Sequence, residues 1–568
     1  MLKIAGFILF LAIAALPLLG ASPKESQVSL RGVVSSPSEE RMEGVLVSAR
    51  KPGGTISVTV VSGATGEYSF PRTKLAPGNY NLTIRATGYV LPPTQVVVSA
   101  SSAAELNLEL KPTDSLFPQL SNAELLASIP GTAAEKAKIN NCVTCHSLSR
   151  ILASRFNADE WYAKLQFMNT VAASGAKHPQ RLQYAGQLPP FPPDEALQRY
   201  LASINLSAVE KWLYRFKPLP RPKGRGTRVI ITEYDLPRRD SQPHDVLVDA
   251  KGMVWYSDFG FPFLGKLNPV TGEIKEYPHP VLKPGFPTGS NPVEIDSSGN
   301  LFLGTMSQGM LARFDPTTEK FTTWTPPPKD NLYAYVTMIS AVAPNGTIWF
   351  ANRTGLQQET LNRLDPRTGK IDTFDPYRRI QGETSGMDQQ AGYGVPSAAS
   401  ARKHGMYGLA TDSRGDGYFL DLSGGSVGRL RAATGEVTLF PTPTPNSGPR
   451  RGVIDKQDRF WFAEYYGNKI GMFDIKTEKI TEWPLPGEYS RPYDAGIDSH
   501  GDIWTAGMHT DSIYRLHPAS GEVTEYLLPT VQANIRKVST GIGSSGKSVV
   551  LWLGENHQAR IARIEPLD

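Results

Sequence analysis

The sequence has few cysteines, little net charge and few long apolar runs. Only two of its 568 residues are cysteine, which excludes a disulfide-stapled secreted fold. Lysine and arginine total 59 against 54 aspartates and glutamates, a net charge of +5, whereas dedicated nucleic-acid binding needs a concentrated basic face. No stretch after the N-terminal run is apolar enough to cross a bilayer. We therefore expect neither a nucleic-acid partner nor a membrane-spanning segment in the mature chain.

Turn-forming and aromatic residues, in contrast, are abundant. The chain has 52 glycines, 46 prolines, 22 tyrosines, 22 phenylalanines and 9 tryptophans. This composition favours turn-rich β structure over helical bundles, and the length suggests three or four domains. We expect a mainly β protein with several modules.

The first 21 residues are predicted to be an export signal. Lys3 gives a positive start, an apolar run follows from Ile4 to Leu19, and Gly20 and Ala21 are small residues suited to cleavage. A membrane anchor is the alternative, but the run is shorter than the roughly 20 residues that a spanning helix needs. The prediction is a periplasmic or otherwise exported protein.

Residues 27–111 alternate apolar and polar side chains in short segments between glycine turns, as at Val28–Val34 and Ile56–Val61. Three further signals follow in order: Gly66-x-Tyr68-x-Phe70, Pro77-Gly78-x-Tyr80 and Gly88-Tyr89. Together they resemble the carboxypeptidase regulatory-like domain, which implies a transthyretin-like β-sandwich. Because that family is usually non-catalytic and is often grouped with carbohydrate-binding sandwiches, we expect a spacer or docking module, with carbohydrate binding as the alternative.

Both cysteines belong to one motif, Cys142-Val143-Thr144-Cys145-His146. Two thiols at this spacing can add across the vinyl groups of haem, and His146 can then bind the iron as proximal ligand. A thioredoxin-like site would want a βαβ context, and a zinc site would want a second pair of ligands; the sequence offers neither. The motif predicts one covalent haem c in a small all-α, cytochrome c-like domain at residues 113–216.

Met168 is the expected second axial ligand of the iron. It is the only methionine between Cys142 and the next domain, on a helix predicted to begin near Asn157. His/Met ligation suits electron transfer because it raises the reduction potential. His178 and an open sixth position are the alternatives. The haem motif, followed by Arg155, Trp161 and Met168, resembles the c-type haem domain of quinohemoprotein amine dehydrogenases.

A repeat fills residues 227–568, after a linker at 217–226. Four short strands recur with a period of about 43 residues, which predicts a β-propeller. The inner strands are expected to start near His244, Asn291, Ile339, Tyr407, Arg450, Tyr493 and Lys537. The last copy lacks a fourth strand and residues 229–237 match it, so we predict seven blades, closed by pairing the two ends of the domain.

The propeller resembles the virginiamycin B lyase family, whose blade signature is close to Trp461–Gly471. In that family a Pro-His-Gly turn supplies a base and a Trp-Phe-Thr-Glu motif a carboxylate for Mg²⁺, and the reaction is an elimination that opens an ester ring. The resemblance implies His244 and Glu464 as catalytic residues. Here the turn is Pro243-His244-Asp245 and the other motif ends in Asp258, and these departures from the family pattern weigh against lyase activity.

Several carboxylates are expected at the mouth of the propeller, where second strands end around the axis: Asp258, Asp421, Glu464 and Glu555. Such groups can bind Mg²⁺ or Ca²⁺ through oxygen or act as acid and base, and His509 and His557 could add ligands. A solvated polar funnel is the alternative. An insertion at roughly residues 377–404 is predicted to form a lid or docking surface over this mouth.

The sequence thus favours an exported c-type haem protein that exchanges electrons with a redox partner protein or a small-molecule substrate. In this interpretation the propeller binds the small molecule or organises the partner. One alternative is a Mg²⁺-dependent lyase of the virginiamycin B lyase type. A second is a non-catalytic binding scaffold with a carbohydrate-binding-like sandwich.

Overall fold

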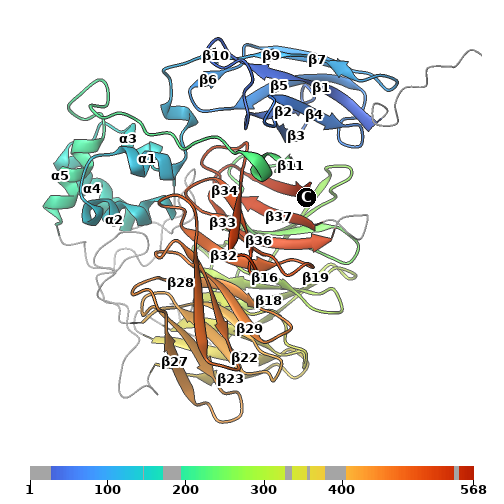
Figure 1. The fold of residues 1–568 in the computed structure, drawn as a ribbon. Helices are drawn as coiled ribbons and strands as arrows, with labels where there is room; N and C mark the ends of the chain where they lie inside the picture. The colour runs from blue at the N-terminus through green and yellow to red at the C-terminus, as the bar shows by residue number, and fades with distance from the viewer. Residues whose placement is uncertain are drawn as a thin grey trace, which may run out of the picture.

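The computed structural model describes residues 27–144, 146–169, 193–326, 335–354, 358–377, 404–542 and 549–567. The chain forms a β-sandwich, a cluster of short helices and a large β-propeller, in that order (Figure 1). The predicted export signal lies outside these residues. In the described part of the chain, no helix is both long and apolar enough to cross a membrane.

The N-terminal sandwich has one apolar core between its sheets. Its longer strands are β1 (Val28–Ser35), β2 (Leu46–Arg50), β3 (Ile56–Val61), β4 (Glu67–Pro71), β5 (Gly78–Arg85) and β7 (Thr94–Val98), and its short ones are β6 (Tyr89–Val90), β8 (Ala104–Glu105), β9 (Leu108–Glu109) and β10 (Lys111–Pro112). β1 pairs with β4, while β3, β2, β5 and β7 follow one another in a second sheet. Leu30, Phe70 and Leu82 are buried between the sheets, because alternate residues of each strand face inward.

Short helices follow the sandwich. They are η2 (Phe117–Gln119), α1 (Asn122–Ser128), α2 (Ala133–Asn140), η3 (Asn141–Thr144), α3 (Ser149–Leu152), α4 (Ala158–Asn169) and α5 (Glu195–Ile204). A capping box of Ser121 and Glu124 starts α1, and the Asp194 side chain caps α5. Leu125, Leu152 and Trp161 are in their shared core. Met168 is on α4, whereas Cys145 and His178 lie outside the described residues.

Seven four-stranded blades form the propeller within the described residues. Blades 1 to 3 are β12 (Pro243–Val248), β13 (Val254–Asp258), β14 (Phe263–Leu267) and β15 (Ile274–Pro278); β16 (Val293–Ile295), β17 (Leu301–Thr305), β18 (Met310–Asp315) and β19 (Lys320–Trp324); and β20 (Tyr335–Ile339), β21 (Ile348–Thr354), β22 (Gln358–Asp365) and β23 (Lys370–Phe374). A short η6 (Met306–Gln308) follows β17, and η5 (Gly224–Thr227) precedes the propeller.

Blades 4 to 6 are β24 (Met406–Thr411), β25 (Gly417–Asp421), β26 (Ser426–Leu430) and β27 (Val437–Pro441); β28 (Pro449–Ile454), β29 (Arg459–Glu464), β30 (Lys469–Asp474) and β31 (Lys479–Pro484); and β32 (Pro492–Ile497), β33 (Ile503–Gly507), β34 (Ser512–His517) and β35 (Glu522–Leu527). Blade 7 consists of β36 (Ile535–Ile542), β37 (Val549–Glu555), β38 (Arg560–Pro566) and β11 (Val229–Asp235). β11 pairs antiparallel with β38, which is the predicted closure of the two ends.

The sandwich is joined to blade 7 by strand pairing. β3 pairs antiparallel with β11, so one sheet of eight strands runs in the order β36-β37-β38-β11-β3-β2-β5-β7 (Figure 1). Leu46 and Val61 of the sandwich pack in the core of blade 7, against Val229 and Ile231. The predicted spacer module is therefore continuous with the propeller, and we call this junction the seam.

Candidate functional site

A two-residue β-bulge recurs near the start of the inner strand in five blades, and the inner strand β20 has a one-residue irregularity. In β12 the pairing with β13 shifts between Pro243 and Val246, and β24, β28, β32 and β36 show the same irregularity. Each bulge carries two consecutive residues: His244-Asp245, Tyr407-Gly408, Arg450-Arg451, Tyr493-Asp494 and Arg536-Lys537. Because bulges re-aim side chains, residues of different blades meet here across the propeller axis.

The second residues of these pairs include a buried ion pair between blades 1 and 5. Both terminal nitrogens of Arg451 donate to the carboxylate of Asp245, each at 2.8 Å. Lys537 lies 3.5 Å from the same carboxylate. Burial opposes ionisation of Asp245, but the charge of Arg451 prevails and holds its pKa well below the ordinary value. Asp245 is therefore charged, and it holds in place the residues that bond to it.

A chain of hydrogen bonds connects Asp245 with the first residues of the pairs. His244 donates through Nδ1 to Asp245 at 2.7 Å, so its Nε2 accepts from the Tyr493 hydroxyl at 3.3 Å. Tyr493 in turn accepts from Tyr407, and Tyr407 accepts from Arg450 at 3.3 Å. Burial lowers the pKa of His244 to about 3, which keeps the imidazole neutral. Both its nitrogens are engaged.

Arg450 is enclosed by aromatic rings. Its guanidinium carbon lies 4.6, 4.3 and 3.9 Å from the ring centroids of Tyr407, Tyr465 and Tyr493. These are short cation–π distances. The Nε of Arg450 is buried and has no hydrogen-bond partner within the described residues.

Two loop residues complete this group of side chains. Arg491 precedes β32 and lies over the Tyr465 ring at 5.5 Å. His509 follows β33, is fully buried and stands edge-on to Tyr465. Burial, with Arg491 and Arg450 nearby, lowers the pKa of His509 well below its ordinary value. We call Tyr407, Arg450, Tyr465, Arg491, Tyr493 and His509 the axial cluster.

The four carboxylates predicted at the mouth each have neighbours of their own in the described part of the chain. Asp258 accepts from Arg238 at 2.7 Å, Asp421 from His404 at 2.5 Å, and Glu464 and Glu555 interact with Glu482 and Glu233 respectively. Each of these contacts lies within or at the edge of its own blade. No three His, Cys, Asp or Glu side chains come close enough to hold a metal in the described ranges. Asp258 and Asp421 bond to loop residues that flank their own blades, whereas Glu464 and Glu555 lie beside acids of outer strands.

Other residues that the sequence analysis singled out differ in how closely their positions match the prediction. Ile339 ends β20 instead of starting it, and Arg536, not Lys537, occupies the position equivalent to Tyr493. His557 lies after β37, where its backbone N–H donates to Ala533. The predicted lid falls mostly on residues 378–403, outside the described residues.

The helical segment docks on the face of the propeller that carries the axial cluster. The Ala123 amide donates to the His509 carbonyl at 2.8 Å. Gln532, in the loop before β36, donates to the Leu120 carbonyl at 2.9 Å and accepts from Ser149 at 2.9 Å. Since β33 ends and β36 begins at this face, the contacts place α1 and α3 beside the mouth (Figure 1).

One contact reaches the cysteine motif itself. The side-chain nitrogen of Asn534 donates to the Val143 carbonyl at 3.0 Å, and its oxygen accepts from Nε of Arg536 at 3.1 Å. Two hydrogen bonds therefore connect a bulge residue of blade 7 with the motif.

The described part of the motif has features that suit a haem ligand. Cys142 is half-buried in η3. His146 donates through Nδ1 to the Ser147 carbonyl at 3.1 Å, which leaves Nε2 as the atom that can bind a metal. Burial lowers the pKa of His146 and so favours the neutral ring that ligation requires. These donors fit a c-type haem.

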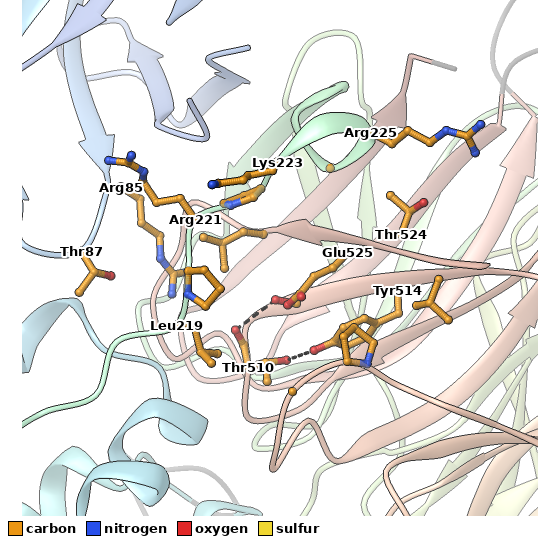
Figure 2. A pocket seen from close by; sticks show the side chains of 18 of the residues that line it. Arg85, Thr87, Leu219, Arg221, Lys223, Arg225, Thr510, Tyr514, Thr524 and Glu525 are labelled. Carbon is orange, nitrogen blue, oxygen red and sulfur yellow. Dashed lines mark hydrogen bonds between the residues drawn. The ribbon is translucent and has the colours of Figure 1, made fainter. Parts of the chain in front are cut away.

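A second candidate site is a cavity of about 450 Å³ where sandwich, linker and blade 6 meet (Figure 2). Arg85, Arg221 and Glu525 line it. Arg85 pairs with Asp511 of the propeller, and Arg221 pairs with Glu39 of the sandwich. Because these cations already hold modules together, we regard the cavity as part of the joint between them.

Comparison with known proteins agrees with two of the modules. Residues 396–567 match the virginiamycin B lyase family, and residues 29–111 match the carboxypeptidase regulatory-like domain. The propeller is virginiamycin B lyase-like. Among solved structures, virginiamycin B lyase from Staphylococcus aureus is 23% identical, with 59% of this chain and 99% of that chain covered and a TM-score of 0.48.

A streptogramin B lyase structure is 21% identical, with 60% of this chain and 99% of that chain covered and a TM-score of 0.48. No curated protein matches the chain. The virginiamycin B lyase-like propeller is compatible with a lyase or with a binding scaffold, and the side chains of the mouth have to distinguish the two.

Proposed function

We propose that the protein is an exported c-type haem protein that transfers electrons, and that its propeller mouth binds a small molecule beside the haem. The observation that carries this proposal is the hydrogen bond from Asn534, at the mouth, to the carbonyl of Val143 in the cysteine motif. A haem attached there would lie next to the axial cluster, so a molecule held by that cluster could exchange electrons with it.

In this proposal Cys142 and Cys145 would hold the haem covalently, and His146 and Met168 would bind its iron. The haem supplies one-electron exchange when it is bound. The residues around it hold these ligands in place: the Ser147 carbonyl orients the His146 ring, and Asn534 fixes the backbone of the motif at Val143. The predicted export signal would bring the chain to a compartment where haem c is attached.

The proposal is tested on full-length protein produced with haem-c maturation. We expect the haem to resist acid-acetone extraction and to give a c-type pyridine haemochrome. Cys142→Ala combined with Cys145→Ala should abolish both. Extractable haem in the unaltered protein would refute covalent attachment.

Ligation by Met168 has its own spectral test. Met168→Ala should remove the weak far-red sulfur-to-iron band of the ferric protein and lower its reduction potential, because a weaker ligand replaces the thioether. Met472→Ala in β30, far along the chain in blade 5, is the matched control and should change neither. An unchanged spectrum in Met168→Ala would favour His178 or an open position.

A Mg²⁺-dependent lyase is the second candidate, and the family match at residues 396–567 favours it. A catalytic base needs a lone pair that faces the substrate, but Nε2 of His244 accepts from Tyr493 and Nδ1 donates to Asp245. The two functions differ in whether turnover needs a metal ion and whether it reduces the haem. Substrate turnover that a chelator stops, with no change in the haem bands, would support the lyase; substrate-dependent reduction of the haem bands that survives the chelator would support electron transfer.

A further inference from the structure

The axial cluster contains buried polar nitrogens that have no hydrogen-bond partner in the described part of the chain. Two of them are guanidinium donors, and the neutral ring of His509 adds one donor and one acceptor. Within the described residues, Nε of Arg450, Nε of Arg491 and both ring nitrogens of His509 are buried without a hydrogen-bond partner. The His509 side chain has no exposed surface and Arg450 is 8% exposed. A buried polar group without a partner costs about 1–3 kcal/mol, so three such residues in one place indicate a missing acceptor.

Among the propeller residues that the structure describes, no carboxylate supplies that acceptor. Asp245, the nearest acid along the hydrogen-bond chain, is already held by both terminal nitrogens of Arg451. Glu294 is paired with Lys537 at 2.6 Å. The nearest groups that Arg450 contacts are the three tyrosine rings. The cluster therefore combines two guanidinium charges with apolar walls.

We infer that the axial cluster binds a carboxylate group, with Arg450 and Arg491 as its charged partners and His509 as a further donor. The inference rests on the proposed function, because the carboxylate would belong to the small molecule held beside the haem. A cation or a metal ion would be repelled by the two guanidinium groups. A carboxylate offers two oxygens in the planar arrangement that guanidinium groups match, and the rings around Arg450 exclude water and strengthen the attraction.

The carboxylate has two possible sources. It can belong to a free small molecule, or it can be a propionate of the attached haem itself. Asn534 bonds to both Val143 of the motif and Arg536, and the Arg536 guanidinium lies 6.0 Å from the Tyr493 ring centroid, so a haem held by the motif would be a neighbour of the cluster. The chemistry is shared, so the experiment must separate the sources.

The test is titration calorimetry on the full-length, haem-loaded protein with benzoate as the probe. Benzamide, an uncharged analogue of similar shape, is the control at the same ionic strength. We expect heat of binding with benzoate and none with benzamide. Arg450→Lys and Arg491→Gln should each weaken benzoate binding by about tenfold or more, the equivalent of one charge-assisted hydrogen bond. Arg414→Gln, an exposed arginine of blade 4 paired with Asp412, is the control and should bind like the parent.

Each outcome decides one question. Benzoate binding that weakens in the two variants assigns the cluster to a free carboxylate. Absence of benzoate binding, together with a haem midpoint potential that falls in Arg491→Gln because a positive charge is lost, assigns it to the haem propionates. Neither effect, or equal binding of benzoate and benzamide, overturns the inference. The haemochrome assay on the same preparation reports separately on the proposed function.

Discussion

Glu464, the last residue of β29, carries a carboxyl group that is protonated at neutral pH. Burial, reinforced by the neighbouring Glu482, raises its pKa to about 8 from an ordinary value of 4.5. The pKa of its neighbour Glu482 is lowered instead, because Lys469 and Thr444 donate hydrogen bonds to that carboxylate at 2.7 and 2.5 Å. One acid of the pair is therefore neutral and the other is charged, which makes Glu464 a pH-sensitive position inside blade 5.

This position should make stability fall as pH rises. Between about pH 4.5 and pH 8 the folded chain keeps a proton on Glu464 that the unfolded chain has already lost, so the free energy of unfolding decreases over that window. Glu464→Gln mimics the protonated acid and should remove the decrease, a gain on the order of 5 kcal/mol above pH 8. Denaturant unfolding at pH 5 and pH 8.5 measures it.

Glu436→Gln, on an exposed residue of blade 4, is the control for that measurement and should leave the pH dependence of the parent intact. If Glu464→Gln also has the parent's pH dependence, the carboxyl group is ionised in the folded protein. In that case Glu464 would again be available as the predicted metal ligand.

At the scale of elements, the repeated bulge decides which side chains reach the axis. Five inner strands carry it. Bulge residues such as His244, Arg450 and Lys537 contact residues of other blades. The Asp245–Arg451 pair joins β12 to β28 in this way, over 206 positions of sequence. An ion pair so deeply buried stabilises only while both partners are present.

Removal of one partner of this pair should be costly. Asp245→Asn leaves Arg451 charged and buried, so we expect a loss of roughly 3–5 kcal/mol in the free energy of unfolding. Asp245→Asn combined with Arg451→Gln should lose less than the sum of the single changes, which a double-mutant cycle by denaturant unfolding detects. Asp365→Asn, which breaks the exposed pair with Arg367, should cost less than about 1 kcal/mol. Additive losses at 245 and 451 would contradict a direct coupling.

The bulge also explains which positions around the axis could be predicted from the repeat period and which could not. The period of the repeat identified the blades, the closing strand and the ring positions of His244, Tyr407, Arg450 and Tyr493. The repeat period does not reveal the extra residue of a bulge. For this reason Lys537 was predicted at the position that Arg536 occupies. The period also shows which residues are equivalent but not where they point.

The direction of the side chains also limits what the sequence could say about the predicted carboxylate site. Asp258 and its equivalents do end the second strands, as expected, but their side chains contact outer strands and loops. The cationic character of the mouth was missed because Arg491 and His509 come from loops outside the repeat's strands. The pair of arginines at 450 and 451 was the available sequence signal, since two adjacent charges on a buried inner strand need partners.

At the scale of the whole molecule, the seam makes sandwich and propeller one structural unit. β11 has β38 on one edge and β3 on the other, and Leu46 and Val61 complete the core of blade 7. The proline-rich linker between them, at residues 217–226, is the natural place to divide the chain by composition alone. The strand pairing crosses that division.

Two altered forms of the protein should therefore behave differently. Residues 227–568 alone expose the edge of β11 and the side chains of Val229 and Ile231, so we expect them to self-associate on size-exclusion chromatography. Full-length protein that is cut by a protease at a site introduced in residues 217–223 should elute as a single species, because the seam holds the two pieces. A monomeric, soluble propeller and separate elution of the cut pieces would show that the seam contributes little.

The seam also sets the order in which the molecule can be assembled during its biosynthesis. β3 and β11 are made long before β36, β37 and β38, so blade 7 stays open while the other six blades form. The residues that seat the cysteine motif, Gln532 and Asn534, stand directly before β36. In a nascent chain the docking surface for the helical segment is therefore incomplete until blade 7 has formed. Closure of the propeller and docking of the cysteine motif consequently occur together, late in folding.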